Sequence, residues 1–350
     1  MFGGKSTEYE VSLRSAHSVI RAVDRNLYSL SLIGVTKENE FFLYSGDVDK
    51  IPTNEWVNDI HKYPVSFAPG SKNPISYIKD GTVIPLKADV IFPIMHGKFC
   101  EDGRLQGLLE LLGIPFVGPD CTASAVCMDK TITKLILQNY GIPQAKAKFL
   151  DREHIANELD KIICDIEKEF TYPVFVKPSS TGSSVGASKA KDRDALKAAI
   201  VNAAKYDRKV LVEEFINARE VEIAVMGTGE RARASIPGEI DPGNTFYDYD
   251  TKYKSDTASY YIPARISEKT SKEIRELALK IYRILGCKNL SRVDFFVEPE
   301  TEKIIFNEIN TLPGFTIISM FPKLFKSEGM TYAEICDELC RDAIDNKTEA

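Results

Sequence analysis

Short apolar runs alternate with amphipathic segments over the first 118 residues of the chain. The apolar runs have the length of buried strands, and the amphipathic segments repeat their apolar residues at helical spacing. We predict strands over 29–34, 88–94 and 114–118, and helices over 11–27 and 105–112. Strands that alternate with helices are typical of an α/β domain with a parallel sheet. We therefore predict a first domain over residues 1–118.

The rest of the chain divides into two further parts. Up to residue 208 we predict strands at Lys148 and over 174–177, and helices over 129–139, 156–168 and 195–204. Beyond it we predict strands over 210–213 and 221–226, a hairpin over 290–310, and helices over 269–285 and 332–344. The fold class is thus α/β, with α+β character in the C-terminal part, and the predicted domains are 1–118, 119–208 and 209–350.

Polar and aromatic residues with little periodicity fill the stretch 237–263. An irregular stretch of this length inside a compact domain is usually either a functional lid or disordered. We expect a lid loop within the third domain.

The 350-residue chain is 43% hydrophobic and 27% charged, with a formal net charge of −6. This composition is typical of a soluble globular protein, and an acidic chain without lysine or arginine blocks argues against non-specific nucleic-acid binding. No apolar run approaches the roughly 20 residues needed to span a bilayer. The first residues also lack the apolar region of a signal peptide. We therefore expect a cytoplasmic protein that binds neither nucleic acid nor membrane.

The predicted hairpin carries polar residues inside otherwise apolar strands. Because alternate residues of a strand share a face, Arg292 and Asp294 lie on one face of the first strand. On the returning strand, Glu308 and Asn310 share a face, opposite Asn307. The pattern predicts a cluster of charged and amide side chains on one side of the hairpin.

A turn centred on Thr301 places Asp294 across from Glu308 and Arg292 across from Asn310. One explanation of these residues is a solvated face with a cross-strand ion pair. However, charge within apolar strands is costly unless it is matched. Two carboxylates and an amide oxygen suit Mg²⁺, whose coordination is often completed by substrate phosphates. We favour a magnesium site.

The segment 174–190 ends an apolar run at Lys177 and continues with serines and glycines. Backbone N–H groups, hydroxyls and an ammonium suit phosphate oxygens, although a plain serine-rich turn has the same composition. Together with the carboxylates of the hairpin, this segment provides the two halves of an ATP site. The GxxxxGK[ST] P-loop and the kinase motifs are absent.

Eight segments resemble, in the same order, the motifs of the D-alanine–D-alanine ligase family. They are FGGKSTEYEVSLRSA (2–16), MHGKFCEDGRLQG (95–107), MDK (128–130), VKPSSTGSSVG (176–186), EEFINAREVE (213–222), FYDYDTKY (246–253), SRVDF (291–295) and NEINTLPGFT (307–316). Cys100 stands where the second motif usually has glycine. The resemblance covers nearly the whole chain and implies an ATP-grasp fold behind a Rossmann-like N-terminal domain. Because the family opens with an apolar strand before FGG, we expect this domain to lack its first strand.

The resemblance assigns residues to the nucleotide and its metal ions. Lys130 and Lys177 are expected to contact the ATP phosphates, with the loop 180–184 closing over them. The other ATP-binding residues implied are Ser180, Ser184, Glu213, Glu214, Ile216, Glu220 and Tyr247. The residues implied to hold two Mg²⁺ ions are Asp294, Glu308 and Asn310.

The resemblance also assigns residues to the amino acids. Glu8 is expected to pair with the ammonium of the first D-alanine and to form a hydrogen-bonded trio with Ser183 and Tyr253. Arg292 and the Gly314 N–H are expected to form an oxyanion hole. The substrate-binding residues implied are His96, Lys252, Ser319 and Met320. Taken singly, Glu8 also suits an ordinary carboxylate in a first helical turn and Ser319 an ordinary helix N-cap.

The reaction implied is the ATP-dependent joining of two D-alanines for peptidoglycan precursor synthesis. The first carboxylate attacks the γ-phosphate of ATP to give an acyl phosphate and ADP. The amine of the second D-alanine, after losing a proton to the Glu8 trio, then displaces phosphate through a tetrahedral oxyanion. A homodimer is expected, because the family is typically dimeric.

Three alternatives are considered. Relatives use D-serine or D-lactate as the second substrate, but Met320 and Tyr253 favour D-alanine, so a D-alanine–D-serine ligase is the nearest alternative. A non-catalytic ATP-grasp subunit is another, against which the metal and oxyanion residues count. An NAD-dependent dehydrogenase does not fit, because FGGK stops after two glycines of the GxGxxG pattern.

Overall fold

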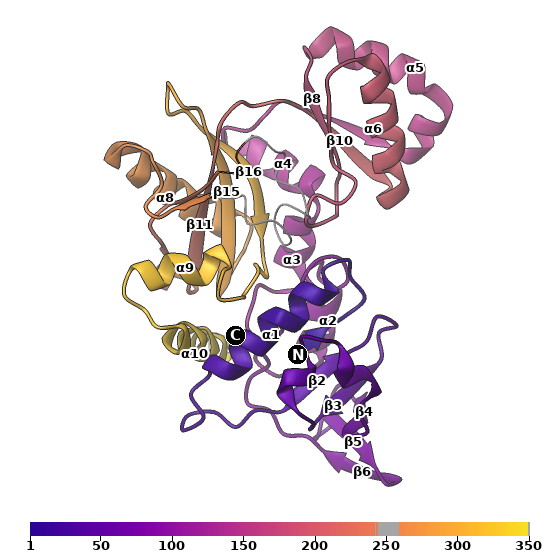
Figure 1. Ribbon diagram of the computed structural model, residues 1–350, viewed down its shortest axis with the longest axis vertical. Helices are drawn as coiled ribbons and strands as arrows, with labels where there is room; N and C mark the ends of the chain where they lie inside the picture. The colour runs from indigo at the N-terminus through magenta and orange to yellow at the C-terminus, as the bar shows by residue number, and fades with distance from the viewer. Residues whose placement is uncertain (242, 244–258, 349–350) are drawn as a thin grey trace.

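The computed structural model describes residues 1–241, 243 and 259–348. Within them the strands form three sheets against which the helices pack, as expected of an α/β protein. Figure 1 shows the first sheet at the bottom of the molecule, the third in the middle and the second at the top. No helix of this part of the chain is long and apolar enough to cross a bilayer.

The first sheet has the order β1-β2-β3-β4-β5-β6 and is accompanied by two α-helices and two short 3-10 helices. Its strands are β1 (Phe2–Gly3), β2 (Leu32–Val35), β3 (Phe41–Tyr44), β4 (Lys62–Phe67), β5 (Ile75–Lys79) and β6 (Thr82–Pro85); its helices are α1 (Tyr9–Ala22), η1 (Val48–Lys50), η2 (Glu55–Asn58) and α2 (Arg104–Leu112). β1 and β2 pair in parallel, whereas β2 to β6 form an antiparallel meander that the sequence did not predict. The predicted strands over 88–94 and 114–118 pair through single parallel bridges, such as Ile91 with Phe116.

Phe2 and Gly3 form the strand whose absence was expected. Phe2 pairs with Gly34 of β2 on one side and bridges to Ile94 on the other, so the short strand lies between two neighbours. The Phe2 ring is 2% exposed and meets the Trp56 ring edge-on, with centroids 5.0 Å apart. Two residues are too short to show strand periodicity, which explains why the sequence pattern did not reveal them.

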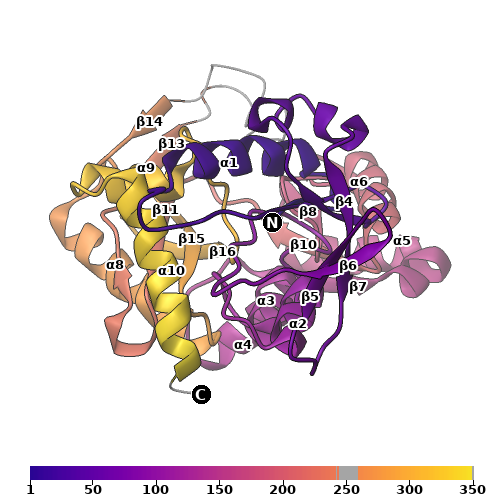
Figure 2. The ribbon, with the colours of Figure 1, turned by 90° about the horizontal axis from the view of Figure 1, so that it is seen from below.

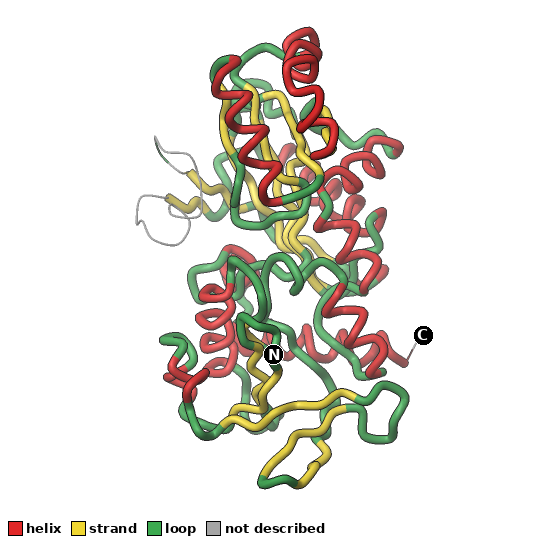
Figure 3. The backbone as a smooth tube through the Cα atoms, turned by 90° about the vertical axis from the view of Figure 1, so that its right-hand side faces the viewer, coloured by secondary structure: helices red, strands yellow, loops and turns green. Residues whose placement is uncertain are grey.

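The second sheet has the order β7-β10-β8-β9, with all its pairs antiparallel. Its elements are β7 (Ala147–Asp151), α5 (Arg152–Glu169), β8 (Val174–Pro178), β9 (Ser188–Ala190), α6 (Arg193–Tyr206) and β10 (Lys209–Glu214). Figure 3 shows α5 and α6 packed beside these strands. β10 lies beyond residue 208 but pairs with β7 and β8. The division into domains at residues 118 and 208 stays a prediction.

The third sheet has the order β14-β13-β11-β15-β16, with β12 on the edge of β11. Its strands are β11 (Arg219–Met226), β12 (Arg233–Ala234), β13 (Gly238–Asp241), β14 (Ser259–Tyr261), β15 (Leu290–Val297) and β16 (Ile304–Asn310). The helices of this part are α3 (Cys121–Met128), α4 (Lys130–Asn139), η3 (Gly229–Arg231), α8 (Glu268–Ile284), α9 (Met320–Ser327) and α10 (Tyr332–Thr348). β13 and β14 lie at the two ends of the stretch 237–263, which therefore has regular structure at its base. Tyr247, Lys252 and Tyr253 lie outside the described residues.

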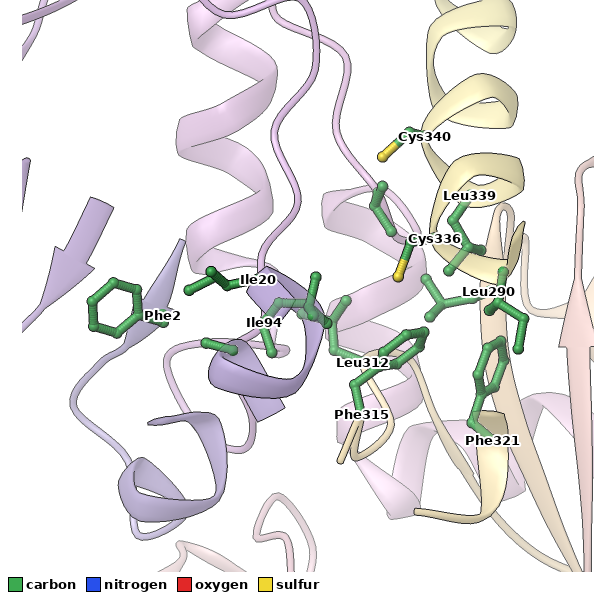
Figure 4. Packing of buried hydrophobic residues seen from close by; sticks show 14 of the residues in the cluster. Phe2, Ile20, Ile94, Leu290, Leu312, Phe315, Phe321, Cys336, Leu339 and Cys340 are labelled. Carbon is green, nitrogen blue, oxygen red and sulfur yellow. The ribbon is translucent and has the colours of Figure 1, made fainter. Parts of the chain in front are cut away.

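One hydrophobic core joins the two ends of the chain. It contains Phe2 and Ile20 from the N-terminal part and Phe321 and Leu339 from the C-terminal part (Figure 4). Figure 2 shows α1 and α10 on the same side of the molecule, and the Tyr28 hydroxyl donates a hydrogen bond to Asp337 of α10 at 2.7 Å. Because α1 follows directly after Glu8, this core fixes the N-terminal segment against the third sheet.

Candidate active site

The register of the β15–β16 hairpin is the one that the sequence predicts. Arg292 pairs with Asn310 and Asp294 pairs with Glu308. The register shifts next to Asp294, where Phe295 pairs with Phe306, so that Asn307 is the extra residue of a β-bulge. Without this bulge, Glu308 and Asn310 would turn to the opposite face of the sheet.

The bulge also changes the position of Asn307, which was expected on the face opposite Glu308. Its Oδ1 lies 3.4 Å from Nζ of Lys177, on the side of the predicted phosphate site. Two successive residues of β16 therefore approach the predicted lysines, because Glu308 Oε2 lies 3.3 Å from Nζ of Lys130. The strict alternation of a regular strand cannot predict this arrangement.

Arg292 is enclosed by carboxylates. Its Nε and Nη2 donate hydrogen bonds to the two oxygens of Asp294 at 2.8 and 2.7 Å, and Nε lies 3.0 Å from Oε2 of Glu222. Burial lowers the pKa of Arg292, but the charges of Asp294 and Glu222 outweigh it and raise this pKa well above its ordinary value. The guanidinium is therefore a permanent buried positive charge at the floor of the pocket.

Three lysines surround the predicted phosphate site. Lys177 Nζ and Lys134 Nζ each lie 2.6 Å from a different oxygen of Glu213, and all three side chains are buried. Lys130 donates to the Thr181 carbonyl at 3.0 Å. Burial raises the pKa of Glu213, but Lys134 and Lys177 lower it below its ordinary value. Lys177 thus approaches the phosphate site while held by Glu213.

The serine loop that follows β8 reaches the N-terminal segment. Ser183 donates a hydrogen bond to Glu8, the residue that precedes α1, and so confirms that these two predicted residues meet. Ser183 and Ser184 both have a positive φ, 48° and 57°, which L-residues rarely adopt. The Ser180 N–H is bound by Asp207 at 2.6 Å. The loop is therefore fixed at both ends by side chains from other elements.

His96 ties the turn after β16 to α1. Its Nδ1 lies 2.8 Å from the Leu312 carbonyl, and its Nε2 lies 3.1 Å from the Ser15 hydroxyl, which also accepts from the Phe315 N–H. This network implies that Nδ1 carries the proton and Nε2 accepts. Leu312 and Phe315 are themselves packed in the core that Figure 4 shows. Gly314 lies between them, so its backbone is firmly placed.

Glu101 holds the same turn from a second side. Its two carboxyl oxygens accept hydrogen bonds from the Gly97 N–H at 3.0 Å and from the Leu312 N–H at 3.2 Å. Burial, together with the negative charge of Glu8, raises the pKa of Glu101 to about 8. The side chain therefore fastens the loop after His96 to the turn before Gly314.

These side chains meet in one pocket between the hairpin, the N-terminal segment and the start of α9. It is lined by nine predicted residues, namely Glu8, His96, Ser183, Arg292, Glu308, Asn310, Gly314, Ser319 and Met320. The Ser319 hydroxyl accepts from the Thr316 N–H at 3.0 Å, and Ser319 directly precedes α9. A neighbouring pocket shares Glu308 and Asn310 with it and adds Lys130 and Gly182. The predicted amino-acid and phosphate residues therefore adjoin one another.

The residues predicted around the adenine lie at the end of β10 and the start of β11. Glu214 accepts from the Lys146 N–H at 2.7 Å, and Ile216 is half-buried. Phe215, which lies between them, is 38% exposed, and Lys189 Nζ lies 3.6 Å from the centre of its ring. Glu220 is half-buried at the start of β11. The segment thus connects the second sheet with the third.

The donor set of the hairpin fits a hard divalent cation. Asp294 and Glu308 are cross-strand neighbours, and the Asn310 Nδ2 donates to Asp294 at 2.9 Å, which leaves the amide oxygen as a ligand atom. No group of three histidine, cysteine or acidic side chains in the described part of the chain is placed to hold a metal. Phosphate and water oxygens would have to complete the coordination, which is the usual situation of Mg²⁺.

The sequence reading assigned no role to Glu101, Glu222, Lys134 or Asn307. Glu222 carried a usable signal, because it is a charge inside the apolar run of β11. The position of Lys134 was also a usable signal, since it lies one helical turn after Lys130. Glu101 and Asn307 depend on tertiary contacts and a bulge, for which the sequence holds no local signal.

Comparisons with known proteins show which family the chain resembles. The family model described as D-ala D-ala ligase N-terminus matches residues 1–119, and that described as D-ala D-ala ligase C-terminus matches residues 136–341. A D-alanine–D-alanine ligase of Clostridium novyi is 46% identical over 99% of this chain and 98% of that protein. One of Clostridium acetobutylicum is 45% identical over 97% of this chain and 95% of that protein.

Solved structures are similar over the whole chain. The VanG D-Ala:D-Ser ligase of Enterococcus faecalis superposes with a TM-score of 0.87 at 39% identity and covers 98% of this chain and 97% of its own. The D-alanine–D-alanine ligase of Coxiella burnetii has a TM-score of 0.86 at 33% identity, with coverages of 99% and 93%. The chain therefore belongs to the D-alanine–D-alanine ligase family.

Proposed function

We propose that this protein is an ATP-dependent D-alanine–D-alanine ligase that makes D-alanyl-D-alanine for peptidoglycan precursors. Family membership supports the reaction class. The observation that carries the proposal is the pocket in which the Glu8–Ser183 pair and Arg292 lie beside the lysines of a nucleotide site. A carboxylate for an ammonium and a cation for an oxyanion are the two features that peptide-bond formation requires.

The first step is phosphoryl transfer. Lys130 and Lys177 approach the same side of the hairpin, where they neutralise charge on the phosphates of ATP. Glu8 binds the ammonium of the first D-alanine and directs its carboxylate toward the γ-phosphate. Asp294, Glu308 and Asn310 would hold Mg²⁺, which would supply neutralisation of charge on the phosphates.

The second step is attack by the amine of the second D-alanine. Ser183, hydrogen-bonded to Glu8, and Tyr253 are the proposed route for the departing proton. The carbonyl carbon becomes tetrahedral, and its oxyanion is stabilised by Arg292 and the Gly314 N–H. Collapse of this intermediate forms the amide bond and releases phosphate. Ser319 and Lys252 bind the carboxylate of the second D-alanine.

A D-alanine–D-serine ligase is the second candidate, favoured by the similarity to the VanG ligase. Met320 bears on the choice, because it lines the pocket, is 4% exposed and lies beside Gly238. An apolar side chain there suits the methyl group of D-alanine better than the hydroxyl of D-serine. We therefore favour D-alanine.

We also propose that the protein is cytoplasmic and forms a homodimer. We propose further that it divides into domains 1–118, 119–208 and 209–350. They follow from the family resemblance and from the composition of the chain.

The test is ADP release by the purified protein with ATP, Mg²⁺ and D-alanine, with products identified by mass. We expect D-alanyl-D-alanine from D-alanine alone and no product from L-alanine. Turnover that requires D-serine would transfer the protein to the second candidate function. Absence of ADP release from a protein that still binds ATP would contradict the ligase proposal.

A further inference from the structure

Three carboxylates lie in a row across the third sheet. Glu222 of β11 pairs directly with Asp294 of β15, which pairs directly with Glu308 of β16. Because paired residues share a face, the three side chains lie on the same side of the sheet. Asp294 and Glu308 belong to the proposed metal site, whereas Glu222 has no assigned role.

Glu222 is buried, with 6% of its surface exposed, and it lines the same pocket as Arg292. Its Oε2 lies 3.0 Å from Nε of Arg292, whose N–H is already donated to Asp294. The contact with Glu222 is therefore mainly one between opposite charges. No three acidic side chains among the described residues are grouped for metal binding.

This geometry gives Arg292 two counter-charges where one would satisfy its charge. A cation bound at the hairpin would be coordinated by Asp294. The interaction of Asp294 with the Arg292 guanidinium would then be weaker. A buried arginine left without a counter-charge is strongly destabilised. Glu222 lies on the side of Asp294 away from Glu308, so it can keep the guanidinium in place while Asp294 is occupied.

We propose that Glu222 is a positioning residue, which holds Arg292 at the oxyanion site independently of Asp294. The inference rests on the proposed ligase function. It deepens that function, because it separates stabilisation of the oxyanion from phosphoryl transfer.

The first test measures coupling without turnover. Thermal unfolding is compared for the native protein, E222Q, R292M and the double variant E222Q/R292M. We expect E222Q to lower Tm in the native background and to raise it in the R292M background, where Glu222 is a buried charge without this arginine. Equal shifts in both backgrounds would overturn the proposal, even if the protein proved not to be a ligase.

The second test measures where the chemistry fails. An arginine that is out of place leaves acyl phosphate formation intact but slows its capture, so the acyl phosphate is lost to water. We expect E222Q to release more than one ADP per dipeptide, and its kcat for ligation to fall by about 10- to 100-fold with little change in KM for ATP. E222D, which keeps the charge, should recover part of the coupling. Release of one ADP per dipeptide, together with an unchanged kcat in E222Q, would contradict the role of Glu222. It would not contradict the ligase function.

D342N is the matched control. Asp342 is also a buried carboxylate near an arginine, 3.6 Å from Arg231, but it lies on α10 outside the pocket. We expect D342N to lose stability and to keep one ADP per dipeptide. If D342N uncouples the reaction as E222Q does, the effect is one of general destabilisation and the proposal fails.

Discussion

Ser183 donates a hydrogen bond to Glu8 across 175 residues of sequence. Two glycines leave room for this contact: a Cβ added to Gly97 would lie 2.3 Å from Oε2 of Glu8, and one added to Gly182 would lie 2.4 Å from it. Both distances are shorter than any real contact. The carboxylate that we assign to the first D-alanine is therefore enclosed by backbone from two separate loops.

G182A is expected to displace Glu8 or the serine loop. Gly182 does not need a positive φ, so the effect of a methyl group there is steric. We expect kcat/KM for D-alanine to fall on the order of 10²-fold, because small displacements of a binding group have effects of this size. Steady-state kinetics with D-alanine as the varied substrate measure it.

The control for this variant is G107A. A Cβ at Gly107 of α2 meets its nearest atom, Cys121 Sγ, at 3.5 Å, which is an ordinary contact. Alanine in a helix interior is favoured over glycine by roughly 0.5–1 kcal/mol. G107A should thus be neutral or stabilising with unchanged kinetics, and full activity in G182A would contradict the assigned position of Glu8.

Removal of the Asp294 charge is expected to abolish ADP formation. D294N keeps the shape of the side chain but removes one of two carboxylates from the proposed magnesium site. Activity measured against Mg²⁺ concentration, with circular dichroism to verify folding, tests this. D59N is the control, since Asp59 is a buried carboxylate that pairs with Lys50, remote from the hairpin. Full activity of D294N would refute the metal assignment.

Glu101 makes the free energy of unfolding fall as the pH rises toward about 8. Its pKa is raised from 4.5 to about 8 in the folded protein, chiefly by burial. Between these values the folded state holds a proton that the unfolded chain has lost, so the free energy of unfolding falls as pH rises. We expect E101Q to remove this decline, which urea denaturation measures between about pH 5 and about pH 8. E10Q should keep the decline. The pKa of Glu10 is lowered, so the ionisation of Glu10 changes stability only at acidic pH.

His96 makes the free energy of unfolding fall as the pH is lowered, which is the opposite of the effect of Glu101. Burial lowers its pKa, although Glu8 and the bond to Leu312 partly oppose this. Below pH 6.5, the ordinary pKa of histidine, His96 binds a proton in the unfolded chain but not in the folded protein. The free energy of unfolding therefore falls as the pH decreases. We expect a shallower decline in H96N between about pH 6.5 and about pH 5. H154N, at an exposed position on α5, should behave as the native protein.

Local patterns predicted the elements that carry the site. The predicted helices at 129–139, 156–168, 195–204, 269–285 and 332–344 are confirmed as α4, α5, α6, α8 and α10. The cross-strand pairs of the hairpin are confirmed as well, because an apolar strand with charges on alternate positions has one register that keeps them together.

The remaining features depend on contacts between distant segments. The antiparallel strands β3 to β6 have half-exposed residues and weak periodicity, so the sequence offers little signal for them. The buried links from Glu101 to Leu312 and from Lys134 to Glu213 need the tertiary fold before either partner can be recognised. Family motifs located Glu8 and Ser183, whose meeting no local pattern could reveal.

The bulge at Asn307 sets unequal limits on length variation along the hairpin. A residue gained or lost in the turn between Val297 and Ile304 changes the loop alone, and the pairing beyond it is preserved. Deletion of Asn307 would remove the bulge and the contact of Asn307 with Lys177, and deletion of Ile309 would move Asn310 to the hydrophobic side of the sheet. Insertions and deletions among natural relatives should therefore gather in the turn and be excluded from the last four residues of β16.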